Sequence, residues 1–192
     1  MIKAFIILAA FFSGEAKDVA VNTEASTIVW TGSKVVGKEH TGTLALASGS
    51  LDISKGVLKG GSFTVDMTTL TDTDLEGEWK GKLEGHLKSD DFFGVEAYPT
   101  ADFKIKKVKS TGNGNYDVTG DITIKGKTES ISFSTSLKEV NDEYEATASI
   151  TIDRSKFDVR YGSGSFFDDL GDKAISDEFT LEVKLVTGNS GS

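Results

Sequence analysis

Apolar residues recur at every second position along most of the chain, with polar residues between them. This period is typical of β-strands that have one buried side and one solvent-facing side. The inward sets are Ile28 and Trp30; Leu44 and Leu46; Phe63, Val65 and Met67; Phe103 and Ile105; Tyr116, Val118, Ile122 and Ile124; Ile131, Phe133 and Leu137; Ala146, Ala148, Ile150 and Ile152; and Phe179, Leu181, Val183 and Leu185. The pattern predicts an all-β domain of about eight strands.

Turn-forming residues separate several of these strands. Residues 112–115 (GNGN), residues 125–127 (KGK) and Asn141-Asp142 have the composition of hairpin turns. Gly60-Gly61 precedes a strand, where glycine usually marks a bulge or a sharp bend. Consecutive hairpins favour an antiparallel eight-stranded barrel. The interior of such a barrel is either filled by side chains or able to hold one ligand.

One segment, at about residues 74–88, follows a helical period instead. Thr73 and Glu76 have the spacing of a capping box. Three glycines on the other faces cost about 0.8–1 kcal/mol each relative to alanine, so the helix depends on packing against the sheet as a lid. A further helical or loop segment is expected near residues 164–172. The apolar stripe of the first helix consists of Leu75, Trp79, Leu83 and Leu87.

Residues 85–103, GHLKSDDFFGVEAYPTADF, contain four aromatic residues and the only proline of the chain. This stretch resembles the signature of the YceI-like family of bacterial polyisoprenoid-binding proteins. Other segments resemble the family in the same order: TIVWTGSK at 27–34, HTGTL at 40–44, LKGGSFTVDMTTL at 58–70, VTGDITIKGKT at 118–128 and the run at 152–185. The resemblance implies a lipocalin-like antiparallel barrel with an apolar interior that holds a long amphiphilic lipid.

The first sixteen residues have the composition of a signal peptide. Lys3 precedes an apolar run at residues 4–12, and small residues flank Glu15 in Gly14-Glu15-Ala16. Nine apolar residues are too few to cross a bilayer, which takes about 20. A buried amphipathic N-terminal helix is the alternative. We expect cleavage after Ala16, a periplasmic or secreted product, a single barrel domain at residues 17–186 and a flexible tail at residues 187–192.

Composition narrows the functional classes. The 192-residue chain has no cysteine, which excludes a lipid anchor on cysteine, thiol catalysis and disulfides. Its net charge of −9 argues against nucleic acid and anionic membrane surfaces as partners. No cofactor is predicted, and the sequence leaves open whether two barrels form a homodimer.

The predicted ligand-binding set combines inward strand residues, helix residues and two aromatic pairs in loops. The apolar members are Phe63, Val65, Met67, Leu83, Leu87, Phe92, Phe93, Phe103, Ile105, Ile122, Ile124, Phe133, Ile150, Ile152, Phe166, Phe167, Phe179 and Leu181. The residues predicted for the polar head group or the pocket mouth are His86, Arg154, Arg160, Tyr161 and Asp177.

Arg154 and Arg160 are the only arginines. Arg154 shares its phase with Ile150 and Ile152, so a continuing strand would direct its side chain inward. A buried guanidinium needs a partner, and Asp177, in phase with Phe179, is the candidate. Two interpretations remain: a structural ion pair that sets the strand register, or an arginine that binds a phosphate or carboxylate head group.

No catalytic residue and no metal site are predicted. His86 and Asp90 have i, i+4 spacing, but one histidine with one carboxylate provides too few ligands for zinc, and the only other histidine is His40. A capping or hydrogen-bonding role for His86 is therefore favoured.

Three functions remain after these exclusions. The first is a carrier, store or sequestering protein for a polyisoprenoid or similar lipid. The second is an isomerase or hydrolase of that lipid, for which Arg154, Asp177 and His86 are the only acid-base candidates. The third is a stress-response or other interaction module with a filled barrel.

Overall fold

The computed structural model describes residues 17–188, so the predicted signal peptide at residues 1–16 lies outside the described residues. The described residues form nine β-strands and one α-helix, which lies between β4 and β5. Its elements are β1 (Lys17–Ala20), β2 (Thr27–Lys34), β3 (Glu39–Ser54), β4 (Val57–Asp72), α1 (Gly77–Lys88), β5 (Thr100–Gly112), β6 (Asn115–Ile124), β7 (Lys127–Val140), β8 (Glu143–Asp153), the 3-10 turns η1 (Arg154–Phe157) and η2 (Gly171–Lys173), and β9 (Ile175–Val186).

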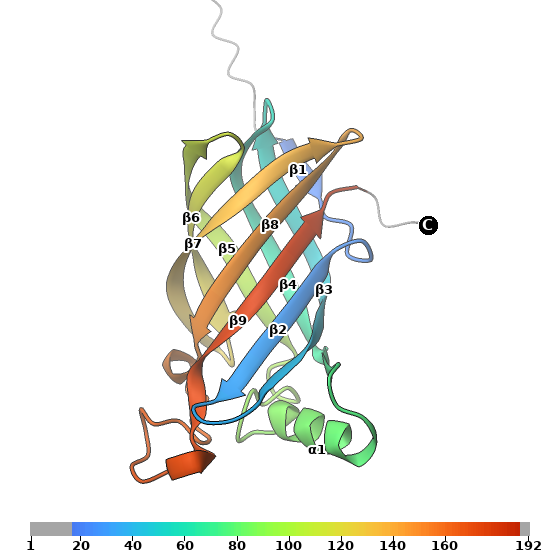
Figure 1. Cartoon of the computed structure of the whole chain (residues 1–192). Coiled ribbons are helices and arrows are strands. Elements are labelled where there is room, and N and C mark those ends of the chain that lie inside the picture. Colours follow the sequence, from blue (N-terminus) through green and yellow to red (C-terminus); the bar gives the residue numbers. More distant parts are fainter. Residues whose placement is uncertain (1–16, 189–192) are drawn as a thin grey trace, which may run out of the picture.

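The strands form a closed antiparallel barrel (Figure 1). Each of β3 to β9 pairs with its sequence neighbour, and β2 joins β9 to β3 and so closes the ring. The short β1 pairs with the second half of β3, whereas β2 pairs with the first half. Because β1 and β2 lie along the same edge of β3, they act as one interrupted strand. The barrel therefore has eight strand positions, as the alternation of apolar residues predicts.

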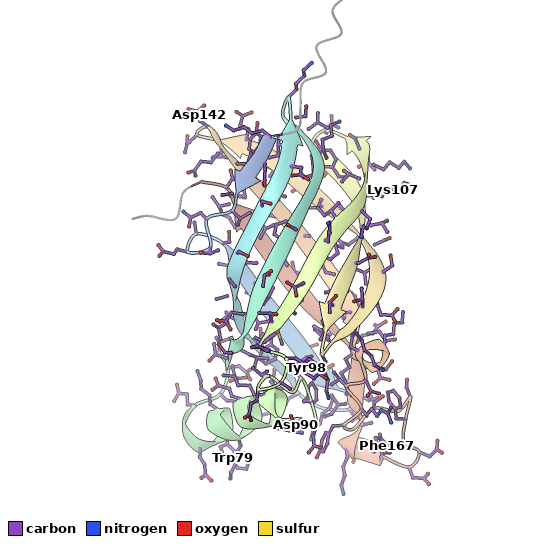
Figure 2. All side chains as sticks on the ribbon, turned by 180° about the vertical axis from the view of Figure 1, so that it is seen from behind. Trp79, Asp90, Tyr98, Lys107, Asp142 and Phe167 are labelled. Atoms are coloured by element: carbon purple, nitrogen blue, oxygen red, sulfur yellow. The ribbon has the colours of Figure 1, made fainter. Side chains whose placement is uncertain are left out.

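The two ends of the barrel differ. One end, which we call the hairpin end, carries tight turns, including Asn113-Gly114 and Asn141-Asp142, whose positive φ angles are those of type I′ turns. The other, which we call the helix end, carries α1, the loop at residues 89–99 and the segment at residues 154–174 (Figure 1). Figure 2 shows Asp142 at the hairpin end, with Trp79 and Phe167 projecting from the helix end. The longest connections therefore gather at one mouth of the barrel.

Two clusters of buried side chains fill the interior in different ways. The hairpin-end cluster includes Leu51, Leu58, Val118, Leu137 and Leu185. The helix-end cluster includes residues that come from α1 and from the loop at residues 89–99 as well as from strands. Four side chains pack against both clusters and mark the boundary between them: Leu44, Val65, Phe103 and Leu181.

The helix begins later than its sequence pattern predicts. Glu76 is the N-cap residue and makes no side-chain capping bond, so the predicted capping box is wrong. The preceding residues are bonded to the barrel instead: the Thr73 hydroxyl donates to the Thr41 carbonyl at 3.2 Å. Trp79 is 70% exposed and does not belong to the packed stripe, and its side chain projects away from the barrel (Figure 2). Leu83 and Leu87 do pack against the helix-end cluster. Within residues 17–188, none of the helices has the length and hydropathy needed to cross a membrane.

The barrel also extends beyond the predicted end of the domain. Thr187 is buried, pairs with Val21 and donates its backbone N–H to the Tyr144 carbonyl at 2.8 Å. The expected flexible tail therefore does not include Thr187, and residues 189–192 lie outside the described part of the chain. The segment near residues 164–172 consists of turns and the start of η2, in agreement with the expected helical or loop segment.

Gly42 is the position where the barrel tolerates a side chain least. A Cβ atom there would lie 1.9 Å from the Thr71 carbonyl oxygen and 2.6 Å from the Trp30 ring, whereas nothing lies within 4 Å of a Cβ added at Gly81 in α1. We expect Gly42→Ala to lower the free energy of unfolding by about 1–3 kcal/mol. Gly81→Ala, the matched control, should raise it by about 0.5–1 kcal/mol. Urea unfolding measures both, and equal effects would contradict this account of β3 and β4.

Candidate functional site

A cavity of about 420 Å³ occupies the helix half of the barrel. Apolar side chains of several strands, of α1 and of the loop at residues 89–99 form most of its wall. Polar residues at the ends of β2, β3 and β9 and in η2 also line it, among them Lys34, His40, Lys173 and Glu178. The apolar lining consists of Ile28, Trp30, Leu44, Val65, Met67, Leu70, Leu83, Leu87, Phe92, Phe93, Ala101, Phe103, Ile122, Ile124, Ile175, Phe179 and Leu181.

The cavity ends at the boundary between the two side-chain clusters. Phe103 lines the cavity and is held by Phe63, whose ring stacks with it at 6.5 Å, and by Phe133 at 5.5 Å. The ring lies against the backbone of Gly120, where a Cβ atom would come within 2.5 Å of it. Leu51 and Val118, beyond this boundary, do not line the cavity. Phe103 is therefore the floor of the cavity, and Phe63 and Phe133 support it from the hairpin side.

Five rings from four parts of the chain form an edge-to-face cluster at the mouth. His86 of α1 lies 4.3 Å from the Tyr161 ring and 5.6 Å from the Phe92 ring. Phe92 contacts Phe93 at 5.1 Å, and Phe93 contacts Phe179 of β9 at 6.1 Å. Edge-to-face contacts of this kind add about 0.5–1.5 kcal/mol per pair beyond the area that they bury. The cluster thus joins α1, the loop at residues 89–99 and β9 across the helix end.

Polar contacts attach α1 to the barrel, because no residue of the helix is fully buried. The Thr71 hydroxyl and the Asp72 N–H both donate to Glu84 Oε1, at 2.6 and 2.9 Å. These two hydrogen bonds lower the pKa of Glu84 below its usual value. Lys88 Nζ donates to the Thr68 carbonyl at 2.9 Å. The helix is therefore held over the mouth by a few bonds to β4.

The Arg154 guanidinium holds the connection between β8 and β9 together. Strand β8 ends at Asp153, yet the Arg154 side chain is only 2% exposed. Its nitrogens donate to the carbonyls of Val159 (2.8 Å), Tyr161 (2.9 Å), Ser176 (2.9 Å) and Ile175 (3.0 Å).

Asp177 is the charged partner of Arg154, as its phase predicts. Its Oδ1 lies 3.4 Å from Arg154 Nη2, and Ser165 donates to its Oδ2 at 2.7 Å. Burial alone would raise the pKa of Asp177. Hydrogen bonds from Ser163 and Ser165, together with the Arg154 charge, outweigh burial and lower this pKa below its usual value. Burial lowers the pKa of Arg154, and Asp177 and Asp153 oppose this shift. The pair is a structural ion pair, which leaves Arg154 few donors for a ligand.

Many of the residues predicted to bind a ligand do line the cavity. They are Val65, Met67, Leu83, Leu87, Phe92, Phe93, Phe103, Ile122, Ile124, Phe179 and Leu181, together with His86, Arg154 and Tyr161. Ile28, Trp30, Leu44, Leu70, Ala101 and Ile175 also line it and were absent from the prediction. The alternation of apolar and polar residues already predicts that Ile28, Trp30 and Leu44 face the barrel interior, so this pattern could have identified them as cavity residues.

The other predicted residues lie elsewhere. Phe63, Ile105 and Phe133 pack against the hairpin-end cluster, beyond the floor, and Ile150 and Ile152 pack in the helix-end cluster without lining the cavity. Phe166 and Phe167 are 40% and 50% exposed because their loop lies outside the barrel. Arg160 is exposed, and Asp177 is turned to Arg154. Helix α1 ends at Lys88, so Asp90 does not share a helical face with His86.

A family model described as "YceI-like domain" matches residues 20–187. The chain belongs to the YceI-like family. Among curated relatives, a UPF0312 protein of Pseudomonas putida is 48% identical over 48 residues, 25% of each chain. A UPF0312 protein of Vibrio parahaemolyticus is 40% identical over 67 residues, 35% of this chain and 32% of the relative. The matches thus span about a quarter to a third of the length of these relatives.

Solved structures of other proteins share the barrel. BcnA of Burkholderia cenocepacia superposes with a TM-score of 0.70 at 21% identity, covering 88% of this chain and 99% of BcnA. A polyisoprenoid-binding domain from Saccharophagus degradans, implicated in plant cell wall breakdown, has a TM-score of 0.64 at 13% identity, covering 90% and 98%. At these identities the likeness shows the fold, which confirms the lipocalin-like barrel expected for a YceI-like protein.

Replacing Arg154 should be far more damaging than replacing Arg160. Arg154→Met leaves four carbonyls and the Asp177 carboxylate without their partner, and we expect the free energy of unfolding to fall by about 3–5 kcal/mol. Arg160→Met makes the same substitution at an exposed position and should lower the free energy of unfolding by less than about 1 kcal/mol. Chemical denaturation distinguishes them, and a similar loss in both variants would contradict the structural role of Arg154.

Acidification should loosen α1 from the barrel. Folding lowers the pKa of Glu84, so the ionised Glu84 side chain stabilises the folded state. This stabilisation is fully present above about pH 4.3, the ordinary glutamate pKa, and is lost as the pH falls through the lowered folded-state pKa. Glu84→Gln should remove this pH dependence and lower the protection of the α1 amides by about 1 kcal/mol. Hydrogen exchange, corrected for intrinsic rates, measures both effects.

Glu78→Gln is the matched control on the same helix. Glu78 is 80% exposed and pairs only with Lys82 in the i, i+4 position. We expect this variant to change amide protection by less than about 0.5 kcal/mol and to keep the pH dependence. The same loss of pH dependence in both variants would show that Glu84 does not anchor the helix.

Proposed function

We propose that this YceI-like protein binds the chain of an amphiphilic lipid, an isoprenoid or a fatty chain, in the helix half of its barrel. The observation that carries the proposal is the cavity, whose floor and walls are apolar and whose polar residues gather at the helix end. This arrangement suits a ligand with a hydrocarbon tail and a polar head. The similarity in fold to a polyisoprenoid-binding domain supports the same ligand class.

The size of the cavity sets how much of a tail is enclosed. At about 30 Å³ for a group the size of a water molecule, 420 Å³ accommodates roughly 14 carbon-sized groups. Each buried methylene contributes about 0.8 kcal/mol, less the entropy lost when the tail is ordered. A tail of this length can therefore bind tightly through its chain alone. The rest of a longer polyisoprenoid would remain at or outside the mouth.

Selection of the head group falls to residues other than Arg154. The donors of Arg154 are already bonded to backbone carbonyls, whereas Lys34, Lys173 and Tyr161 line the polar part of the cavity. Two lysines at the mouth favour a head group that is polar or negatively charged. Arg154 supports the mouth by shaping the segment that carries Tyr161.

The proposed setting is outside the cytoplasm. The signal-peptide pattern of residues 1–16 supports export, and a chain without cysteine needs no disulfide to fold there. A carrier, a store or a sequestering protein would each use the same cavity.

The two alternatives have less support. An enzyme would need an acid-base pair in the cavity, but Asp177 does not line it and faces Arg154, and the His86 ring packs against the rings of Phe92 and Tyr161. A filled interaction module is disfavoured by the cavity itself.

Filling the cavity should abolish binding while the barrel stays folded. Ala101 is buried in the wall, so we expect Ala101→Phe to weaken binding of a fluorescent polyene fatty acid by at least about tenfold, or about 1.4 kcal/mol. Ala45→Phe adds the same ring to an exposed position of β3 and should leave the affinity unchanged. Fluorescence titration measures both, with urea unfolding as the test of folding.

Protein purified from a bacterial host under native conditions should also release lipid. Organic extraction followed by mass spectrometry should recover an isoprenoid or acyl species from the wild type and much less from Ala101→Phe. Recovery of no lipid from folded wild-type protein, together with no binding of the fluorescent fatty acid, would overturn the proposal.

A further inference from the structure

A second polar cluster lies at the rim of the cavity, beside the mouth residues already described. His40 Nδ1 and one carboxylate oxygen from each of Asp72 and Asp74 lie within 4.8 Å of one another. His40 is the second residue of β3 and lines the cavity. Asp72 is the last residue of β4, and Asp74 follows two residues later. None of the three belongs to the predicted lipid-binding set.

The strand register brings these three residues together. Gly42 pairs with Asp72 in the β3–β4 ladder, so His40, two residues before Gly42, lies beside the chain that continues from Asp72 to Asp74. The backbone then orients both carboxylates. The Leu75 N–H donates to Asp72 Oδ1 at 2.7 Å, and the Thr41 N–H donates to Asp74 Oδ1 at 2.8 Å. One oxygen of each carboxylate is thus fixed by the backbone, as in metal sites whose ligands are held by outer hydrogen bonds.

The remaining oxygens are the ones that need a partner. Asp74 Oδ2 lies 3.0 Å from His40 Nδ1. Asp72 is fully buried, and its Oδ2 has no hydrogen-bond partner among the described residues. A buried carboxylate oxygen without a partner costs about 1–3 kcal/mol or more, so the structure leaves a position that a positive charge would stabilise.

Charge within the cluster points the same way. Two carboxylates this close disfavour each other's charge, and the His40 ring lies beside both of them. A divalent cation would neutralise both carboxylates with His40 uncharged.

We propose that His40, Asp72 and Asp74 bind one divalent metal ion of the zinc type at the rim of the cavity. An imidazole nitrogen with two carboxylate oxygens suits Zn²⁺, whereas Mg²⁺ and Ca²⁺ prefer oxygen ligands only. Tetrahedral coordination at about 2.0–2.2 Å places ligand atoms roughly 3.4 Å apart, so side chains whose ligand atoms now lie within 4.8 Å of one another would move closer together around the ion. Three protein ligands leave the fourth position to a water molecule.

Titration calorimetry with ZnCl₂ tests the site, using the full chain without a polyhistidine tag at neutral pH. The wild type should bind one Zn²⁺ per chain at about 0.1 mM metal or below, and MgCl₂ should give no saturable binding in that range. Asp74→Asn and His40→Gln should each weaken Zn²⁺ binding by at least about tenfold. Both positions are partly exposed, so these variants are preferable to a change at the fully buried Asp72.

Glu39→Gln is the matched control. Glu39 is exposed, is adjacent to His40 and lies on the opposite side of β3, and the substitution removes the same charge as Asp74→Asn. We expect it to change Zn²⁺ affinity by less than about twofold. A Zn²⁺-dependent rise in melting temperature that is present in the wild type and Glu39→Gln, and absent in the two ligand variants, would support the site independently.

Two outcomes would overturn the proposal. One is the absence of saturable Zn²⁺ binding to folded wild-type protein. The other is an equal loss of binding in Glu39→Gln and Asp74→Asn, which would indicate general attraction to an acidic surface. Lipid binding can be measured separately in metal-free buffer, so failure of the metal site leaves the proposed lipid function untouched, and the reverse also holds.

Discussion

The packing of Phe103 across the middle of the barrel is the constraint on which the site depends. A closed barrel of eight strand positions has an interior that must be either filled or occupied by a ligand. In this chain Phe63, Phe133 and the backbone of Gly120 hold the Phe103 ring, and the hairpin half beyond it contains a cluster of buried aliphatic side chains together with Tyr116. The space left in the helix half is therefore a blind pocket with its mouth at one end.

The connections at the helix end convert that space into a defined site. Without its own buried core, α1 relies on Glu84, Lys88 and two leucines to remain over the mouth. On the other side of the mouth, Arg154 donates hydrogen bonds to four backbone carbonyls and pairs with the Asp177 carboxylate. These contacts fix the conformation of the segment that carries Tyr161. One wall is thus attached by fewer polar bonds than the other, so α1 is the part of the mouth that is more easily displaced.

Much of the fold follows from the period of the sequence, because side chains of a strand alternate strictly between two faces. The inward sets follow from that rule, and the hairpin turns follow from their Gly and Asn residues. The burial of Arg154 does not follow from it, because β8 ends at Asp153 and Arg154 lies in η1. The start of α1 does not, since Thr73 bonds to Thr41 in the barrel, which its local spacing with Glu76 could not reveal. The position of the floor likewise depends on which rings meet across the barrel, and Phe63 and Phe133 have the same alternating pattern as residues that line the cavity.

The cluster at the rim shows a different limit of sequence analysis. The sequence predicts no metal site, because His86 with Asp90 provides too few ligands for zinc and the only other histidine is His40. The register of β3 and β4 alone places Asp72 and Asp74 next to His40 in the fold. Asp72 is shielded from solvent only because the strands close into a barrel. Long-range register and burial, rather than residue type, bring these three residues together.

A lipid of about 14 tail carbons with a nitroxide at the end of its tail tests the half-hollow barrel most directly, through methyl NMR line broadening. The account predicts strong broadening of Val65 and Leu181, which line the floor of the cavity, and little at Leu51 and Leu58 in the hairpin half. Equal broadening in both halves, or broadening confined to the outer surface of the barrel, would contradict it.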